Sequence, residues 1–343
     1  MESLTQQRIL SQQSQIRRLQ PPSISEPDGL SSGGYRHLFG PVHSRRLGLS
    51  LGIDVVPIKT CTFNCIYCQL GRTTYQTLKR EEYVPASEVM AELAAYLERG
   101  GTADYLTFSG SGEPTLHSKL GEMIVQTKKM SKIPVAVLTC GALLFDPQVR
   151  KELMPADVVL PSLNAASIKT FNVINRPHGK LRLPEIIDGL TLFRREYRGQ
   201  IWLEIMLIKG INDSAEEIDL LKKAIAEIKP DKVHLNTVVR PPAESEVQPL
   251  SEVELRSVLI ALGPPAEIIA ERPALAKPAS GTHLMEEVVK LLARHPATLE
   301  EIAEYLVCPL ETVARVLTIL AEAGKIQAQE HQCKKFYTAV AQD

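Results

Sequence analysis

The sequence predicts an α/β protein, a partial (β/α)6 barrel of the TIM type followed by a small winged helix-turn-helix domain. Two observations predict the barrel. From residue 51 onward, short β-branched or aliphatic runs alternate with longer amphipathic patterns, as in a parallel sheet that is buried on both faces. The 343 residues also suffice for a barrel of roughly 200–250 residues and a smaller module.

Six strand-like runs form the predicted sheet, and right-handed crossovers place helices between them. In such barrels the active residues follow the carboxyl ends of the strands. The runs are 51–56, 104–109, 134–139, 157–162, 201–208 and 233–239, with helical patterns such as 86–98, 116–130 and 214–228.

The regions outside the barrel differ from it in composition. Residues 1–34 are rich in Gln, Ser and Pro, which predicts a disordered extension before a barrel at 35–271. Residues 272–283 are rich in Pro and Ala and predict a linker. The remainder, 284–343, has three helical patterns and then a Gly-Lys turn with two strand-like runs, which predicts the winged-helix domain. Those helical patterns lie at about 284–294, 298–306 and 309–323.

Bulk composition predicts a cytoplasmic protein that does not enter membranes. The formal net charge is −1, so no global field attracts nucleic acid or anionic lipid. No apolar run reaches the roughly 18 residues that span a bilayer, and the N-terminus lacks the apolar region of a secretory signal. In a reducing compartment, clustered cysteines indicate metal binding rather than disulfides.

Three of the six cysteines fall within eight residues, in the pattern C-x₃-C-x₂-C, directly after the first predicted strand. Cys61, Cys65 and Cys68 can hold three irons of a four-iron cluster and leave the fourth open. The alternative is a zinc knuckle, but such sites usually show paired C-x₂-C units or a nearby H-x₃₋₅-H. No His lies within thirty residues downstream of Cys68.

The cysteine loop, with Tyr67 before its last cysteine, resembles the defining motif of the radical S-adenosylmethionine (SAM) superfamily. The resemblance covers about residues 36–270 and implies one [4Fe–4S] cluster and SAM as cofactors. One unit further on, the segment 109–116 resembles the family's GGEP element, whose backbone and Glu engage the SAM amino group. Its residues here are Ser111, Gly112, Glu113 and Pro114, with Ser in place of the first Gly.

The resemblance assigns further SAM contacts to later strands. Ser162 and Asn164, after the fourth strand, match a position that contacts the ribose, or they cap a helix. Glu204 lies in the strand that supports the adenine and ribose, and it needs a cation or hydroxyl partner because burying it alone is costly. Arg240, after the sixth strand, matches a ligand for the SAM carboxylate or a substrate anion, or it forms a structural salt bridge.

Within the superfamily, the chain resembles the branch grouped with wyosine synthetases. Wyosine synthesis uses a second cluster, whereas the other cysteines here are scattered. The resemblance rests on 41–57, 69–74, 174–178 and 236–242, and the scattered cysteines are Cys140, Cys308 and Cys333.

The implied reaction begins with SAM chelating the open iron. The reduced cluster passes one electron to the sulfonium, and the 5′-deoxyadenosyl radical abstracts hydrogen from an unidentified substrate, while the protein positions the reacting carbon. A flavodoxin or ferredoxin supplies the electron. Cys140 ends the third strand, where it donates a hydrogen atom to a product radical or contacts the substrate, or it is a small buried residue in a turn.

The charge of the C-terminal region argues against a DNA-binding role. Residues 284–343 hold six Lys or Arg and nine Asp or Glu, a formal −3, and the presumed recognition helix offers only Arg315 as a cation. Because nucleic acids are bound largely by neutralising phosphates, a protein or peptide contact, or packing on the barrel, is favoured. Only the wing, with Lys325, Lys334 and Lys335, leaves a nucleic-acid role open.

Two further alternatives follow from the same residues. A metal-binding regulator whose winged helix reads DNA is the rival class, and the acidic module and the Gly-Glu-Pro element count against it. The basic segment 43–48 either clamps an anionic substrate or pairs with acidic helix ends.

Overall fold

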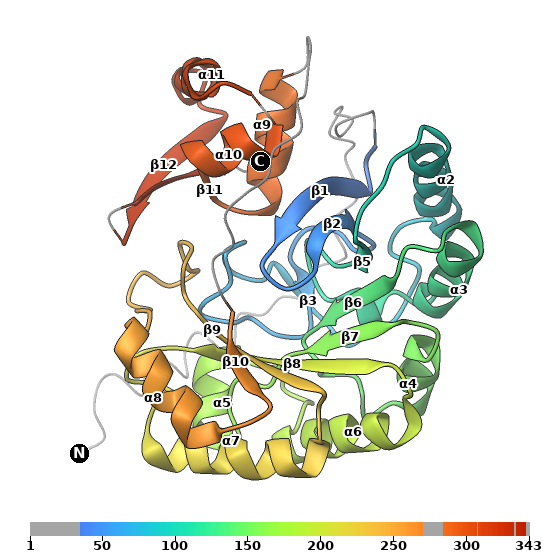
Figure 1. Cartoon of the computed structure of the whole chain (residues 1–343), viewed down its shortest axis with the longest axis vertical. Coiled ribbons are helices and arrows are strands. Elements are labelled where there is room, and N and C mark those ends of the chain that lie inside the picture. The colour runs from blue at the N-terminus through green and yellow to red at the C-terminus, as the bar shows by residue number, and fades with distance from the viewer. Residues whose placement is uncertain (1–34, 270–283, 307, 333, 341–343) are drawn as a thin grey trace.

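A computed structural model describes residues 35–269 and 284–340, apart from residues 307 and 333. The predicted N-terminal extension and linker therefore lie outside the described residues. We call residues 35–269 the sheet domain and residues 284–340 the C-terminal module (Figure 1).

The sheet domain is built on one eight-stranded sheet in the order β1-β2-β5-β6-β7-β8-β9-β10. β1 pairs antiparallel with β2, and every other neighbouring pair is parallel. The strands are β1 (Leu38–Ser44), β2 (Gly48–Ile53), β5 (Tyr105–Phe108), β6 (Val135–Thr139), β7 (Val158–Pro161), β8 (Gln200–Leu207), β9 (Lys232–Thr237) and β10 (Ala266–Ile268). A separate two-stranded ladder joins β3 (Thr60–Cys61) to β4 (Tyr75–Gln76).

The helices of the sheet domain lie around the outside of the curved sheet (Figure 1). Their apolar stripes close the core against the strands, while polar caps start several of them: Ser214 begins α7, and Ser251 with Glu254 forms a capping box on α8. The helices are α2 (Ala86–Glu98), α3 (Leu120–Met130), α4 (Pro147–Leu153), α5 (Ile168–Asn175), α6 (Leu183–Glu196), α7 (Ala215–Ile228) and α8 (Glu252–Leu262), with a short 3₁₀ turn at Pro114–Leu116.

The inner face of the sheet holds its own apolar cluster. Leu47, in the turn between β1 and β2, is only 3% exposed and packs with residues from β6, β7 and β8. The other buried members of this inner cluster are Ala136, Val158, Leu160 and Trp202.

The six predicted strands are confirmed, but the structure adds two strands at the sheet edges. β1 was not predicted because its segment contains Gly40-Pro41, and its pairing with β2 shifts register between Phe39 and Val42. Proline lacks an N–H to donate, so it is tolerated at an edge. The basic segment 43–48 is therefore the end of a hairpin strand and its turn. At the other edge, β10 has only three residues.

The C-terminal module has three helices and a three-stranded antiparallel sheet around a core of its own. The predicted helices and hairpin are all present. They are α9 (Leu284–Arg294), α10 (Leu299–Leu306), α11 (Leu310–Glu322), β11 (Ala297–Thr298), β12 (Ile326–His331) and β13 (Lys334–Ala339), with sheet order β11-β13-β12.

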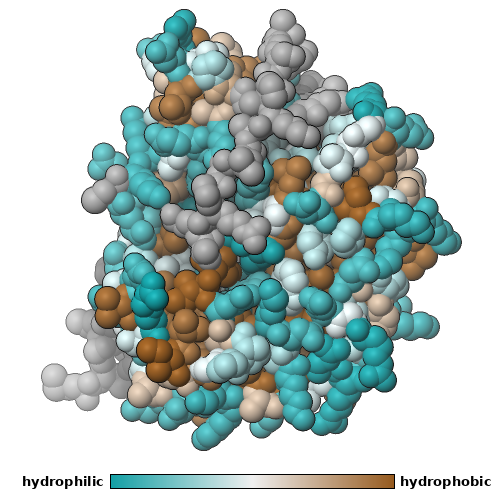
Figure 2. All heavy atoms as spheres, in the orientation of Figure 1, coloured by the Kyte–Doolittle hydropathy of each residue, from teal (hydrophilic) through white to brown (hydrophobic). Residues whose placement is uncertain are grey.

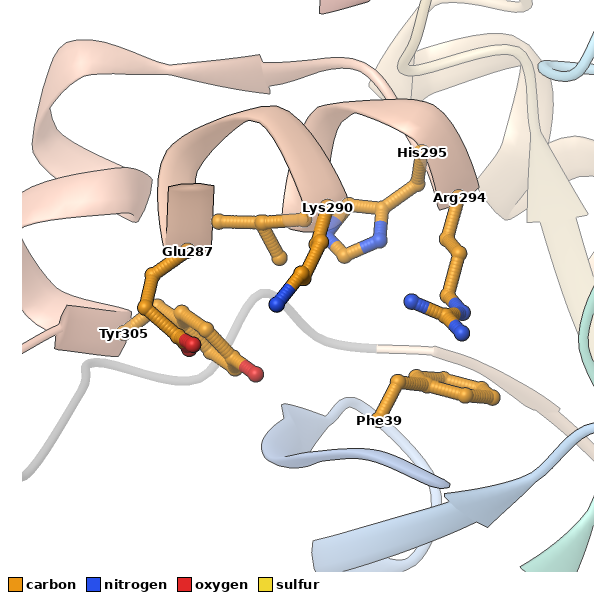
Figure 3. Close-up of a pocket in the computed structure, with 7 residues that line it drawn as sticks. Phe39, Glu287, Lys290, Arg294, His295 and Tyr305 are labelled. Atoms are coloured by element: carbon orange, nitrogen blue, oxygen red, sulfur yellow. The ribbon is translucent and has the colours of Figure 1, made fainter. Parts of the chain in front are cut away.

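The module packs on the sheet domain at two places, the edge strand β1 and the segment that follows β9. At β1, the Gly40 amide donates to the Tyr305 hydroxyl (3.0 Å), and the Arg294 guanidinium lies 5.3 Å above the Phe39 ring. Figure 3 shows this contact beside a gap that Lys290 enters from α9. After β9, the Gln332 amide donates to the carbonyl of Val238 (2.7 Å).

Exposed apolar residues gather in Figure 2 over α8, which carries Val253 (74% exposed) and Ile260 (81%). Within the described part of the chain, no helix is long and apolar enough to cross a membrane.

Candidate functional site

The cysteine loop lies at the carboxyl ends of the parallel strands. It follows β2, and Cys61 ends the short strand β3. All three cysteines are half-buried and free of disulfides.

Each of the three sulfurs has a hydrogen-bonding neighbour. The Lys59 ammonium donates to Cys68 Sγ (3.0 Å) and the Asn175 amide to Cys65 Sγ (3.4 Å). A hydrogen bond from Cys140 lowers the pKa of the Cys61 thiol, against the effect of burial. Burial, together with Cys61 and Cys68, raises the pKa of Cys65 to about 12. A bound metal would remove these protons, because thiolates are the ligands.

The donor set fits an iron–sulfur cluster better than a single ion. Among residues 35–269 and 284–340, as far as they are described, no three His, Cys, Asp or Glu side chains are placed to hold one metal ion. In a cluster each thiolate binds a different iron, so the sulfurs need not converge. Lys59 and Asn175 donate hydrogen bonds to cysteine sulfurs, and such hydrogen bonds tune the reduction potential of an iron–sulfur cluster.

The SGEP segment (residues 111–114) lies directly against the start of the cysteine loop. The Glu113 amide donates to the Thr60 carbonyl (3.0 Å), and the Lys59 amide donates to the Ser111 carbonyl (2.7 Å). A Cβ on Gly112 would lie 1.9 Å from the Thr60 oxygen, so only glycine permits this approach. The two predicted motifs are therefore in contact.

Glu113 is 1% exposed and holds the turn after β6. Its Oε1 accepts bonds from the Thr115 amide (3.0 Å), the Thr115 hydroxyl (2.6 Å) and the Thr139 hydroxyl (2.6 Å), while Oε2 accepts from the Cys140 amide (2.6 Å). A carboxylate has about four acceptor positions, two on each oxygen. Four donors already match that number, three of them on Oε1, so a further donor such as an ammonium group would share Oε2 with the Cys140 amide.

Asp54 follows β2 and orients the first residue of the SGEP segment. Its Oδ2 accepts hydrogen bonds from the Ser111 amide (3.1 Å) and hydroxyl. Burial raises the pKa of Asp54, although Arg294 of the C-terminal module opposes this. Its Oδ1 is buried without a hydrogen-bond partner.

Asn164 joins the fourth and fifth predicted strands to the cysteine loop. Its amide donates to the Tyr67 hydroxyl (2.7 Å), and its Oδ1 accepts from the Met206 amide (2.9 Å). The alternative that Ser162 or Asn164 caps a helix is wrong, because α5 begins at Ile168 with Ser167 as its cap.

Glu204 and Arg240 lie outside this network. Glu204 forms an ion pair with Arg46, so its expected cation comes from the hairpin turn. Arg240 Nη2 lies 3.4 Å from Glu301 of the C-terminal module. This pair is the structural salt bridge that was predicted as one alternative for Arg240. Ser162 pairs with Glu204 through an isolated backbone bridge.

Cys140 lies at the carboxyl end of β6, beside the cysteine loop. Its Sγ is 3.0 Å from the Thr62 hydroxyl and hydrogen-bonds Cys61. Burial raises the pKa of the Cys140 thiol, and Cys61 and Glu113 add to that effect. The thiol is thus held in its protonated form next to the predicted cluster ligands.

Sequence reasoning missed the residues that support the site: Lys59, Asp54, Asn175 and Asn212. Asn212 is fully buried, and its amide donates to the carbonyls of Asn164 (2.7 Å) and Met206 (2.8 Å). One signal for Asp54 and Lys59 was available in the sequence. Both are charged residues in the short, mostly apolar segment that leads to Cys61.

Comparison with known proteins shows the family to which the chain belongs. The model of the "Radical SAM superfamily" matches residues 55–224, from the segment before the cysteine loop into α7. A protein of Methanocaldococcus jannaschii, UPF0026 protein MJ1312, is 31% identical over 308 residues, covering 87% of this chain and 94% of that protein. A Brachyspira hyodysenteriae protein named GTPase Obg is 37% identical over 297 residues, or 86% of this chain, but the chain spans only 44% of its length.

Among solved structures, one described as "TYW1 with a lysine-pyruvate adduct bound" has the same fold, with a TM-score of 0.50 and 20% identity. The match covers 65% of this chain and 75% of that one. Fold and sequence thus define an α/β iron–sulfur enzyme. The chain belongs to the radical SAM superfamily, and within it to the family of the UPF0026 proteins. It therefore uses a [4Fe–4S] cluster and SAM to generate a 5′-deoxyadenosyl radical, and it needs an electron donor such as a flavodoxin or ferredoxin.

Proposed function

We propose that Cys61, Cys65 and Cys68 hold a single [4Fe–4S] cluster with one iron left for SAM. The observation that supports this most is the contact between the cysteine loop and the SGEP segment, which Gly112 alone makes possible. When bound, the cluster and SAM supply the radical that removes hydrogen from the substrate. In this proposal the sheet domain is a partial (β/α)6 barrel within residues 35–271.

The residues around the loop then bind and orient SAM. Glu113 Oε2 would accept the SAM ammonium beside the Cys140 amide, and the backbone of Ser111 and Gly112 would line the same place, with Pro114 following. Asn164 fixes the Tyr67 ring beside Cys65, and Ser162 would contact the ribose. Glu204, held by its pair with Arg46, would support the strand that contacts the nucleoside.

The C-terminal module, residues 284–343, is proposed to be a winged helix that presents the substrate to the barrel. Its junction with the sheet domain lies after the carboxyl end of β9, at Val238 and Arg240. Because radical chemistry occurs at that end, a macromolecular substrate held by the module would reach it directly.

RNA modification in the wyosine-synthetase-like branch is the second candidate, and one observation favours it. Arg240 Nε, Lys290 Nζ and Arg294 Nε are all buried at the junction without a hydrogen-bond partner. Arg240 also pairs with Glu301, and Arg294 also donates to the Arg36 carbonyl. The three nitrogens named above still lack an acceptor in the described part of the chain, which is costly for a buried cation, and a phosphate would supply one. A peptide substrate would need no such cations, so loss of RNA binding in Lys290→Ala would support this candidate.

Cys140 is proposed to donate a hydrogen atom to the product radical. Burial raises the pKa of its thiol, and the thiol hydrogen-bonds Cys61, one of the proposed cluster ligands. The test uses Cys140→Ala with the substrate once identified. The proposal expects product with altered stereochemistry or a lower rate, and wild-type rate and stereochemistry would remove it.

Anaerobic reconstitution tests the cluster assignment. With SAM and dithionite, the wild type should form 5′-deoxyadenosine, Cys61→Ala should form none, and the matched Cys308→Ala should retain the activity. Cys308 lies in the C-terminal module, far from the loop in sequence and packed against a separate core. Equal activity in Cys61→Ala and wild type would contradict the assignment.

A further inference from the structure

The segment 174–178 forms the outer wall of the cysteine loop. Loop amides donate to its carbonyls, Asn64 to Asn175 (2.9 Å) and Ile66 to Ile174 (3.0 Å), and the His178 amide donates back to Thr62 (3.0 Å). The segment thus pairs with the loop like a short antiparallel strand. It ends α5, and the side chain of Asn175 also reaches Cys65 Sγ.

An apolar groove lies on the outer side of this wall. It is formed by α5 and the start of α6, and Phe171 is both part of its lining and part of the core. The Phe171 ring packs edge-on against the Phe63 ring, with 5.5 Å between centroids. Phe63 lies between Cys61 and Cys65 in the sequence, so this ring pair joins the lining of the groove to the cysteine loop. The groove is lined by Ile168, Phe171, Asn172, Leu181, Arg182, Leu183 and Pro184.

The rim of the groove is positively charged, unlike the protein as a whole. Residues 168–184 contain four Lys or Arg and no Asp or Glu, whereas the chain has a net charge of −1. All four are exposed; they are Lys169, Arg176, Lys180 and Arg182. Arg176 shares Glu244 with Arg72, whereas the other three exposed cations form no ion pair with an acidic side chain in the part of the chain that the structure describes.

Two large aliphatic side chains are exposed among these cations. Ile168 is 61% exposed and Val173 46%, both on α5. An apolar centre with a rim of one sign is how a transient, electrostatically steered contact is built. Its complement is a small protein with an acidic surface around an apolar patch.

We propose that this docking surface, residues 168–184, receives an acidic, low-potential electron-transfer protein of the flavodoxin or ferredoxin type. The inference rests on the proposed cluster ligands. One electron leaves the reduced carrier and enters the oxidised cluster, so the carrier is oxidised by one electron, the cluster is reduced by one, and no bond or proton is exchanged. On this side the ring contact between Phe171 and Phe63 and the backbone hydrogen bonds of 174–178 connect the groove to the cysteine loop.

Charge reversal on the rim tests the proposal. The rim variant is Lys169→Glu/Lys180→Glu, which replaces two exposed lysines and changes the net charge by −4. The control variant, Lys132→Glu/Lys151→Glu, changes the net charge by the same amount at two exposed lysines near α3 and α4. The readouts are the affinity for oxidised flavodoxin by calorimetry and the rate of cluster reduction by reduced flavodoxin, followed by electron paramagnetic resonance. The rim variant should lose about tenfold or more in both, with the loss shrinking at high salt.

The control pair should behave as wild type in both readouts. If the rim variant binds and accepts electrons as well as the wild type, or if both variants weaken equally, the docking surface is wrong. Dithionite bypasses the carrier, so SAM cleavage with dithionite should be unchanged in the rim variant. Failure of dithionite cleavage in the wild type would instead contradict the proposed function, which keeps the two ideas separable.

Discussion

The two ends of the parallel sheet differ in their buried side chains, which are mainly apolar around Leu47 at the amino end and mainly polar at the carboxyl end. At the amino end the turn between β1 and β2 enters the sheet, with Leu47 packed against Trp202 and its neighbours. This turn is fixed at the start of β5, where Asp104 accepts from the Leu49 amide (2.7 Å). At the carboxyl end, Glu113, Asn164 and Asn212 are buried and satisfied by hydrogen bonds instead.

This difference predicts that the amino end of the sheet mainly determines stability and that the carboxyl end mainly determines activity. An apolar end can be closed by packing alone, whereas a polar end needs each buried group paired, and pairing fixes geometry. We therefore expect changes at the amino end to lower the free energy of unfolding with little effect on SAM cleavage. Changes at the carboxyl end should affect cleavage before they affect folding.

The largest effect is expected for Gly112→Ala. The new Cβ would approach the Thr60 carbonyl to 1.9 Å and push the SGEP segment away from the cysteine loop. Since misplacement by about 1 Å can cost a hundredfold in rate, 5′-deoxyadenosine formation with dithionite should fall by about that factor. The control is Gly179→Ala, where the added Cβ meets no atom within 4 Å. Equal rates in the two variants would refute the contact.

Leu47→Ala tests the opposite end. Leu47 is 3% exposed in the inner cluster, so truncation should lower the free energy of unfolding by about 2–4 kcal/mol in denaturant titrations. Cleavage per folded molecule should remain close to wild type. Leu192→Ala, at a 39% exposed position on α6, should cost far less. A large loss of cleavage without loss of stability would break the comparison.

The smallest effect is expected for Glu217→Gln, which loosens the start of α5. Glu217 Oε1 accepts from the amides of Ala166 (2.6 Å) and Ser167 (3.0 Å), and its Oε2 accepts from the Ser167 hydroxyl (2.5 Å). Losing this charged acceptor should cost about 1.5–3 kcal/mol of unfolding free energy at pH 7.

The cost should also depend on pH. Burial raises the pKa of Glu217, but the hydrogen bonds from Ser167 and Ala166 outweigh it, so the pKa lies below its ordinary value. A depressed carboxyl pKa stabilises the fold above the unfolded value, about 4.3, and that contribution is lost as the pH falls below it. The difference between wild type and variant should therefore shrink in acid. A difference that grows in acid would show that the hydrogen bonds do not favour the ionised form.

Much of the sheet and the core of the site could be predicted from the sequence, because both depend on local patterns. The six strands have continuous apolar runs, and the cysteine loop and SGEP segment follow neighbouring strands whose carboxyl ends must meet. The edge strand β1 could not be predicted, since Pro41 and an irregular register hide its pattern.

Partners from distant segments were equally hidden. Glu204 indicated a need for a cation, but nothing in its own strand pointed to Arg46. The role of 174–178 as the wall of the cysteine loop depends on backbone hydrogen bonds, which carry no side-chain signature. Sequence predicts which groups need partners better than it predicts which partners they find.

The most direct test of the central claim is the metal content of the anaerobically reconstituted protein and its response to SAM. The assignment predicts about four iron and four sulfide ions per chain, and a reduced-cluster resonance that shifts when SAM is added. Serine variants of Cys61, Cys65 and Cys68 should lose both properties. One zinc ion per chain, or a cluster whose resonance ignores SAM, would contradict it.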